Sequence, residues 1–155
     1  MKKDIVAGLG EIGDPIYKLL SKNQNVIGYD KNKTLMNQTK YKKFEKFQTC
    51  LLHIAIPVTK NFNSNIIELY NTFLPECIVI HSTISPGTTE NIQKKLKIPI
   101  IYSATRGVHK RMIKDLKRYT KFFSISHNAP KKEWAISQFS KSMKKSGIKT
   151  QRMSK

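Results

Sequence analysis

Three glycines near the start of the chain have the spacing of a phosphate-binding turn. The segment D-I-V-A-G-L-G-E-I-G at 4–13 places a short apolar run directly before Gly8, Gly10 and Gly13. The first glycine permits a tight turn, the second lets a pyrophosphate approach the backbone, and the third lets the next helix pack closely. Backbone N–H groups at the start of that helix face the phosphates, helped by the helix dipole. We therefore expect a dinucleotide to bind at Gly8, Leu9, Gly10, Glu11, Ile12 and Gly13.

An acidic residue follows at the distance that this chemistry requires. The apolar run N-V-I-G-Y at 25–29 ends in Asp30, about 20 residues beyond the glycines, where a carboxylate accepts hydrogen bonds from the adenosine ribose. The same carboxylate repels the 2′-phosphate of NADP. We therefore predict NAD in preference to NADP, although Lys31 and Lys33 soften the repulsion.

The elements that must position these residues alternate between two periodicities. Apolar runs at 50–56, 77–81, 98–102 and 122–125 predict further strands, and the unbroken run at 50–56 is typical of a strand buried on both faces. Helical spacing follows Gly13, continues over 65–73 with Asn63 or Ser64 as N-cap, and returns at 132–145. Residues 1–155 therefore predict one α/β domain, a Rossmann-type doubly wound, mostly parallel sheet with helices on both faces.

Composition narrows the choice of partners. Among 155 residues, 29 are Lys or Arg and 10 are Asp or Glu, which gives a formal net charge of +19. A polyanion partner and the codon bias of an AT-rich genome both explain this excess. The lysines are scattered and lack interleaved aromatic residues, which favours codon bias, so we do not expect nucleic acid as a partner. The positive field still attracts anionic small-molecule substrates and nucleotides.

The cysteines and the distribution of apolar residues indicate which kinds of site and location to expect. Cys50 and Cys77 stand singly in or beside apolar runs, which predicts reduced core residues and no metal site. A leader segment and a membrane-length apolar run are both missing from the sequence, so we expect a cytoplasmic protein without a membrane partner.

Four segments resemble the UDP-glucose/GDP-mannose dehydrogenases, within the group that includes 6-phosphogluconate and 3-hydroxyacid dehydrogenases. They are G-L-G-E-I-G-D-P-I at 8–16, V-I-G-Y-D at 26–30, I-P-V-T at 56–59 and S-T-I-S-P-G-T-T at 82–89. The resemblance implies a bound NAD. It also implies that two loops line the cofactor cleft, through Ile56, Pro57, Val58, Ser82 and Thr83. The alternative for the last segment is that it merely caps a helix.

The catalytic residues remain unknown from the sequence. The resemblance implies a nucleophilic Cys and a Lys in a later domain, which we do not expect within these 155 residues, and an assisting Glu where the sequence reads S-A-T-R-G. The remaining candidates for chemistry are Thr83, Arg106 and His109. Arg106 would clamp a phosphate or carboxylate, and His109 would move a proton near neutral pH. A solvated loop is an equally good explanation of the last two.

Three functions from different classes fit this sequence. The first is the NAD-binding half of a dehydrogenase for a nucleotide sugar or hydroxyacid, with the missing groups supplied by the second copy in a homodimer or by a separate substrate-domain chain. The second is a non-catalytic module that senses or sequesters a nucleotide. The third, a basic nucleic-acid-binding protein, is the least favoured.

Overall fold

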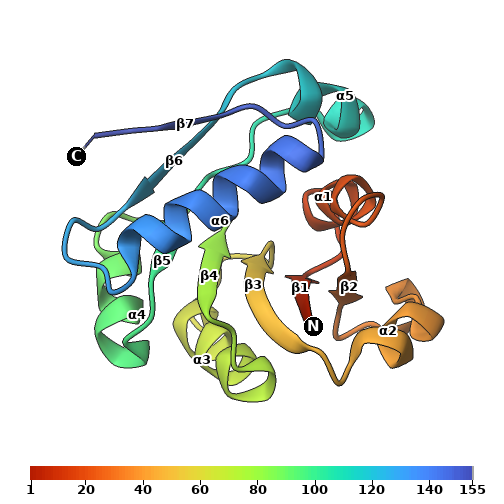
Figure 1. Ribbon diagram of the computed structural model, residues 1–155, viewed down its shortest axis with the longest axis horizontal. Coiled ribbons are helices and arrows are strands. Elements are labelled where there is room, and N and C mark those ends of the chain that lie inside the picture. Colours follow the sequence, from red (N-terminus) through yellow and green to blue (C-terminus); the bar gives the residue numbers. More distant parts are fainter. Residues whose placement is uncertain (155) are drawn as a thin grey trace.

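The computed structural model describes residues 1–154, in which strands and helices alternate along the chain (Figure 1). The strands of this part form one seven-stranded sheet in the order β2-β1-β3-β4-β5-β6-β7. Their bounds are β1 (Lys2–Ala7), β2 (Val26–Tyr29), β3 (Gln48–Ile54), β4 (Cys77–Ile80), β5 (Ile100–Tyr102), β6 (Lys121–Ile125) and β7 (Thr150–Arg152). The first five run parallel, and β6 is antiparallel to β5. The predicted mostly parallel sheet is confirmed.

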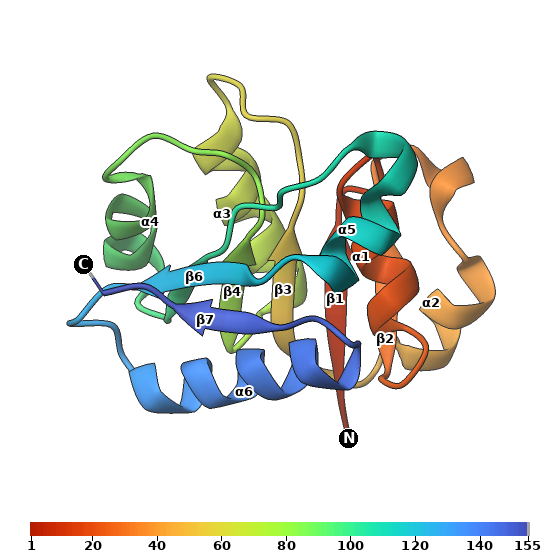
Figure 2. The same ribbon diagram turned by 90° about the horizontal axis from the view of Figure 1, so that it is seen from above.

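Helices cover both faces of the sheet, as predicted: in Figure 1 they lie above and below the strands, and Figure 2 looks down on one of these faces. One layer holds α1 (Gly13–Leu20), α5 (Met112–Arg118) and α6 (Lys132–Lys145), and the other holds α2 (Gln38–Phe44), α3 (Phe62–Phe73) and α4 (Thr88–Leu96). The strand pleat sorts the side chains between the layers, because successive residues point to opposite faces. In β4, Val79 packs toward the first layer while Ile78 and Ile80 pack toward the second.

The strand order creates a crevice at the carboxyl ends of β1 and β3. From β1 the chain crosses α1 to reach β2 on one side, and it then returns through α2 to β3 on the other side. The connections therefore diverge between β1 and β3, which is where open α/β sheets bind their ligands. The glycine turn lies at this point.

Gly8 and Gly13 are required here by close backbone contacts. Gly8 has a φ of +94°, and a Cβ added to it would lie 2.5 Å from the carbonyl oxygen of Ala55 after β3. A Cβ on Gly13 would lie 1.5 Å from the carbonyl oxygen of Gly8. The third glycine thus brings the start of α1 directly onto the exit of β1.

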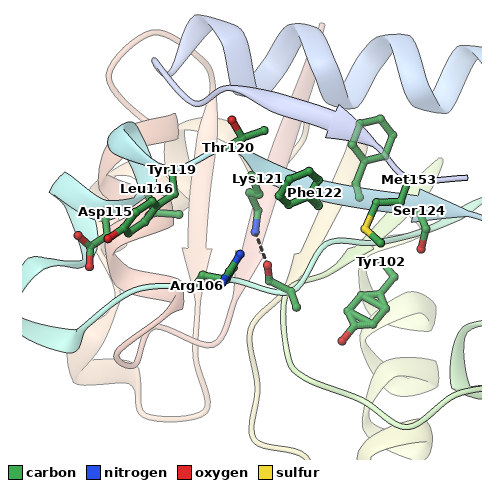
Figure 3. Close-up of a pocket in the computed structure, with 12 residues that line it drawn as sticks. Tyr102, Arg106, Asp115, Leu116, Tyr119, Thr120, Lys121, Phe122, Ser124 and Met153 are labelled. Carbon is green, nitrogen blue, oxygen red and sulfur yellow. Dashed lines mark hydrogen bonds between the residues drawn. The ribbon is translucent and has the colours of Figure 1, made fainter.

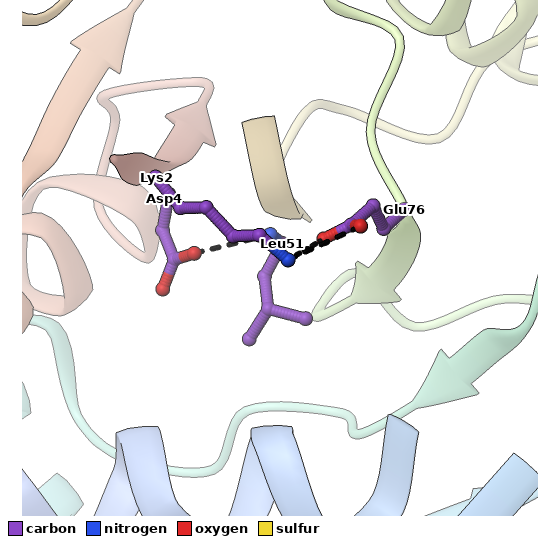
Figure 4. Close-up of polar contacts among 4 residues, drawn as sticks. All are labelled: Lys2, Asp4, Leu51 and Glu76. Carbon is purple, nitrogen blue, oxygen red and sulfur yellow. Dashed lines mark hydrogen bonds and ion pairs between the residues drawn. The ribbon is translucent and has the colours of Figure 1, made fainter. Parts of the chain in front are cut away.

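Polar contacts join the strands at the opposite, amino-terminal edge of the sheet (Figure 4). The ladder between β1 and β3 shifts register between Lys3 and Ile5, and an Asp4 carboxylate oxygen accepts the N–H of Leu51 there at 3.0 Å. Burial raises the pKa of Asp4 to about 6. Lys2 and Glu76 form an ion pair of 2.9 Å, whose exposure makes its contribution to stability small.

Two expectations about side chains meet different outcomes. Cys50 and Cys77 are free and buried, as predicted. The predicted N-cap of α3 is wrong, because the helix begins at Phe62 and its N-cap is Asn61. Phe62 is buried in the core layer of α3, so packing extends the helix backward beyond the apolar repeat that starts at Ile66.

Within residues 1–154, no helix combines the length and apolar character needed to cross a membrane.

The packing around the turn predicts that the same substitution has a large effect at Gly13 and a small effect at Gly10. We expect Gly13→Ala to lower the free energy of unfolding by at least about 3 kcal/mol, because its Cβ would overlap the Gly8 carbonyl. Gly10→Ala is the matched control, since a Cβ there would meet nothing within 4 Å, and its effect should stay within about 0.5 kcal/mol. Urea unfolding followed by circular dichroism measures both, and equal effects would contradict the packing described here.

Candidate functional site

The turn after β1 presents backbone donors to the crevice. Within residues 1–154, the N–H groups of Gly10, Glu11 and Ile12 have no hydrogen-bond acceptor. The N–H of Leu9 is donated to an Asp30 carboxylate oxygen at 2.8 Å, so the acid at the end of β2 is held against the turn. The other Asp30 oxygen accepts the N–H of Asn32 at 2.8 Å. The turn therefore combines free N–H groups with a fixed carboxylate.

A cavity of about 250 Å³ adjoins this carboxylate on the α3 side of the sheet. Five of the predicted cofactor-binding residues line it, namely Gly8, Asp30, Lys31, Ile56 and Pro57. A second cavity, of about 690 Å³, lies between the start of α1 and the segment 109–114. This second cavity is lined by Leu9, Gly10 and Glu11, so the glycine turn lies between the two cavities.

The loops after β3 and β4 are tied to each other. The Ser82 hydroxyl donates to the carbonyl oxygen of Ile56 at 2.7 Å and is buried. Ser82 therefore fixes the two strand exits relative to each other, which is a structural use of the hydroxyl. Thr83 is exposed, and the Val58 side chain is 52% exposed beside the crevice.

The structure separates the two basic candidates for chemistry. Arg106 lines a third cavity, between the exit of β5 and the start of β6 (Figure 3). His109 lines the cavity beside α1, where its Nδ1 is 3.9 Å from a carboxylate oxygen of Glu11. Arg106 and His109 therefore do not meet at one place, although only two residues separate them in the sequence.

A largely buried polar row, which we define as His53, His81, Thr105 and Lys121, runs from the carboxyl ends of β3, β4 and β5 to the start of the antiparallel strand β6. His53 Nδ1 and His81 Nε2 are 2.9 Å apart and the two rings are stacked. His81 Nδ1 is 3.5 Å from the Thr105 hydroxyl, which accepts from Lys121 Nζ at 2.9 Å. The polar row lies on the sheet face that α1, α5 and α6 cover, because it continues the pleat of Leu51, Val79 and Phe123.

Burial controls the protonation of the polar row. Both histidines are fully buried, and desolvation lowers the pKa of His53 to about 3. Desolvation, the Lys121 ammonium and His53 together hold the pKa of His81 well below its usual value. Desolvation also lowers the pKa of Lys121 to about 7. The histidines are therefore neutral at physiological pH, while Lys121 titrates near it.

Sequence reasoning does not predict this polar row as a unit, because Lys121 is one lysine among many and the two histidines lie 28 residues apart. A signal was present in the sequence, because His53 is the one polar residue of the apolar run C-L-L-H-I-A-I and His81 ends the next run. Only the register of β3 and β4, which pairs His53 with Val79, places both rings on the same face.

Among residues 1–154, no group of three or more His, Cys, Asp or Glu side chains has an arrangement that could hold a metal ion. The geometry of the turn is suited to an anionic group, because its donors are N–H groups and an open approach lies above Gly10.

The fold of this chain is similar to the folds of several solved dehydrogenases and of an imine reductase. UDP-D-ManNAc dehydrogenase from Pyrococcus horikoshii aligns with a TM-score of 0.69 and 17% identity, over 97% of this chain and 46% of that one. Prephenate dehydrogenase from A. aeolicus aligns with a TM-score of 0.73 and 15% identity, over 99% and 60%. An imine reductase from Bacillus cereus aligns with a TM-score of 0.69 and 11% identity, over 99% and 55%.

These likenesses establish the fold, and they agree with the family that the sequence motifs resemble. The chain spans about half the length of the UDP-sugar dehydrogenases that it matches. No protein-family model matches the sequence, and a comparison with curated proteins finds no match.

The neutral histidines predict a loss of stability in acid. His53 has a pKa of about 3 in the folded chain and 6.5 in the unfolded chain, so the unfolded chain binds more protons between these values. The contribution of neutral His53 to stability is therefore complete above pH 6.5 and falls as the pH drops through this window, by up to about 1.4 kcal/mol per pH unit. Urea unfolding at stepped pH measures the slope.

His53→Phe is the matched comparison, because it keeps an aromatic ring and removes the titrating group. Asp4 acts in the opposite direction, since its raised pKa makes the folded chain bind more protons between pH 3.8 and about 6. Asp4 is common to both proteins and cancels in their difference. We expect the stability of the wild type relative to the variant to fall between pH 6.5 and 4. Parallel pH profiles would show that His53 is not held neutral.

Proposed function

We propose that this chain is the NAD-binding domain of a dehydrogenase. The observation that carries the proposal is the turn at Gly10, where unpaired N–H groups, an open approach and the fixed Asp30 carboxylate converge at the crevice between β1 and β3. A dinucleotide uses each of these features, since its pyrophosphate takes the donors and its adenosine ribose takes the acid. The dehydrogenase folds of the structural neighbours support the same assignment.

The residues of the turn fit the cofactor. The pyrophosphate would take the N–H groups of Gly10, Glu11 and Ile12, because no side chain obstructs the approach to Gly10. Asp30 already accepts two N–H groups, and a carboxylate has about four acceptor sites. It therefore retains acceptors for the two ribose hydroxyls. When bound, NAD supplies a hydride acceptor for the oxidation of an alcohol or a related group.

Charge around the ribose position favours NAD over NADP. The Asp30 carboxylate is held in place by two hydrogen bonds, so it cannot turn away from a 2′-phosphate. Lys33 places its ammonium 4.9 Å from the Tyr29 ring centre and is directed toward that ring. Lys31 is exposed at the edge of the 250 Å³ cavity and is the one lysine lining it.

The substrate half of such an enzyme would come from elsewhere. The 155 residues span about half of each nucleotide-sugar dehydrogenase that they resemble in structure, so the remaining groups would lie outside these residues, in a second subunit, a separate chain or another part of a longer chain. Thr83, which is exposed at the exit of β4, is a candidate to face these groups. A nucleotide sugar or a small hydroxyacid is the proposed substrate, and both are anions that the net charge of +19 attracts.

Calorimetric titration with NAD tests the cofactor site. We expect saturable binding that survives moderate salt, and we expect Gly10→Val to reduce the affinity at least about 100-fold, because a branched side chain would fill the approach of the pyrophosphate. The variant should unfold at the same urea concentration as the wild type, since the space around Gly10 is open. Unchanged NAD binding by Gly10→Val would refute the site, as would binding lost equally to all polyanions with salt.

A second variant tests the cofactor preference. Asp30→Asn keeps an amide oxygen that can accept the Leu9 N–H, and it removes the negative charge. We expect the ratio of NAD to NADP affinity to fall at least about tenfold, with NADP binding improved or unchanged. Lys94→Gln on the exposed face of α4 is the control for general charge effects. An unchanged ratio in Asp30→Asn would separate Asp30 from the ribose.

A non-catalytic nucleotide-binding module is the second candidate, and one observation favours it. Within residues 1–154, Arg106 and His109 lie in separate cavities, so neither forms an acid–base pair beside Thr83. Hydride transfer decides between the candidates. Reduction of NAD by any candidate alcohol, with the chain alone or with an added partner chain, establishes a dehydrogenase, and NAD binding without turnover in either condition favours the module.

A further inference from the structure

The third cavity, between β5 and β6, is independent of the dinucleotide crevice. It has a volume of about 470 Å³ and lies where the exit of β5, the end of α5 and the start of β6 splay apart (Figure 3). It shares no lining residue with the two cavities beside the glycine turn. Small-molecule sites in proteins have volumes of about 300–1,000 Å³, so this cavity is large enough for one.

Two cations and one acid line the cavity. The cations are Arg106 and Lys121, and neither forms an ion pair within residues 1–154. The acid is Asp115, whose carboxylate accepts the N–H of Val108 at 2.8 Å and lies 4.0 Å from Arg111. The Asp115 carboxylate therefore already has partners in the neighbouring segment of the chain, Val108 and Arg111. The cavity retains a surplus of positive charge.

The Lys121 ammonium is unusual because it is buried without a counter-ion. Its side chain is 6% exposed, and its three acceptors are the carbonyl oxygens of Ser103 and Ala104 and the hydroxyl of Thr105. All three acceptors are neutral. A charge removed from water without an opposite charge is costly, and an anion in the adjoining cavity would compensate it.

Apolar side chains make up much of the remaining wall. Tyr119, Phe122 and Met153 line the cavity and are respectively 44%, 38% and 54% exposed. Large apolar groups that gather at one exposed hollow indicate a binding surface. Tyr102 closes the side toward β4, where its hydroxyl oxygen lies 3.5 Å from the Ile84 N–H. The cavity therefore offers a cationic end and an apolar body.

We propose that this cavity binds a small organic monocarboxylate with an aromatic or other flat apolar body. The Arg106 guanidinium, exposed and unpaired at the mouth, matches a carboxylate through two parallel hydrogen bonds. Lys121 adds its positive field from beneath. The Arg106 guanidinium carries a full charge, and Lys121 is protonated more fully when an anion is bound beside it, while the one acid is already engaged. The cavity therefore balances a single negative charge better than a phosphate dianion. The ring of the ligand packs against Phe122 and Tyr119.

Titration with 2-naphthoate tests this proposal. A ligand of this size that gains about 0.3 kcal/mol per non-hydrogen atom binds with a Kd near 1 mM. We expect saturable binding of that order, seen by calorimetry or by the ligand's NMR signals. The uncharged 2-naphthamide has the same shape, and we expect it to bind at least tenfold more weakly because the cations then gain no counter-charge.

Two variants locate the site. Arg106→Gln removes an exposed charge without disturbing the core, and we expect it to weaken 2-naphthoate at least fivefold. Lys121→Met, checked for folding by circular dichroism, should weaken it as well. Lys94→Gln removes one positive charge from α4 and should leave binding unchanged. Gly10→Val should also bind 2-naphthoate normally, so failure of the dinucleotide site and failure of this site are distinguishable.

Several outcomes would overturn the proposal. Equal affinity for the acid and the amide would show that the cavity recognises an apolar surface alone, as a partner protein would use. Displacement of 2-naphthoate by inorganic phosphate at equal concentration would show a simple anion site. Unchanged binding in Arg106→Gln, or equal loss in Lys94→Gln, would place the carboxylate elsewhere.

Discussion

The contact between Gly13 and the carbonyl of Gly8 is the constraint on which the arrangement of this protein depends. A Cβ at Gly13 would lie 1.5 Å from that oxygen, so only glycine lets α1 start directly on the exit of β1. This closeness directs the N–H groups of the turn into the crevice between β1 and β3. It also brings the Leu9 N–H to Asp30, which joins two strand ends into one polar surface.

The two faces of the sheet are not equivalent. The face covered by α2, α3 and α4 is apolar up to the strand ends, with Ile54 and Ile80 fully buried. The other face carries the buried polar row, where His53 Nε2 has no hydrogen-bond partner within residues 1–154. Buried polar groups cost stability unless they are satisfied. The polar row therefore carries part of this cost at the carboxyl edge of the parallel strands, beside the loops that line the cavities.

The fold of this chain does not by itself specify its chemistry. Dehydrogenases and an imine reductase share the fold at 11–17% identity, so the fold accommodates several chemistries and the side chains of each site select among them. The glycine turn is the part suited to a common cofactor. The cavity at Arg106 and Lys121 is lined by side chains that lie beyond the four segments on which the resemblance in sequence rests.

The sequence by itself determined the alternation of strands and helices, because apolar periodicity depends only on residues that are close together in the sequence. It also located the glycine turn and Asp30, since their spacing follows from the length of one strand–helix–strand unit. It could not determine that β6 is antiparallel, that Phe62 starts α3, or that His53 and His81 stack. Those outcomes depend on strand register and on packing between segments far apart in the chain, which only the tertiary structure decided. For the same physical reason, residues as close in sequence as Arg106 and His109 face different cavities.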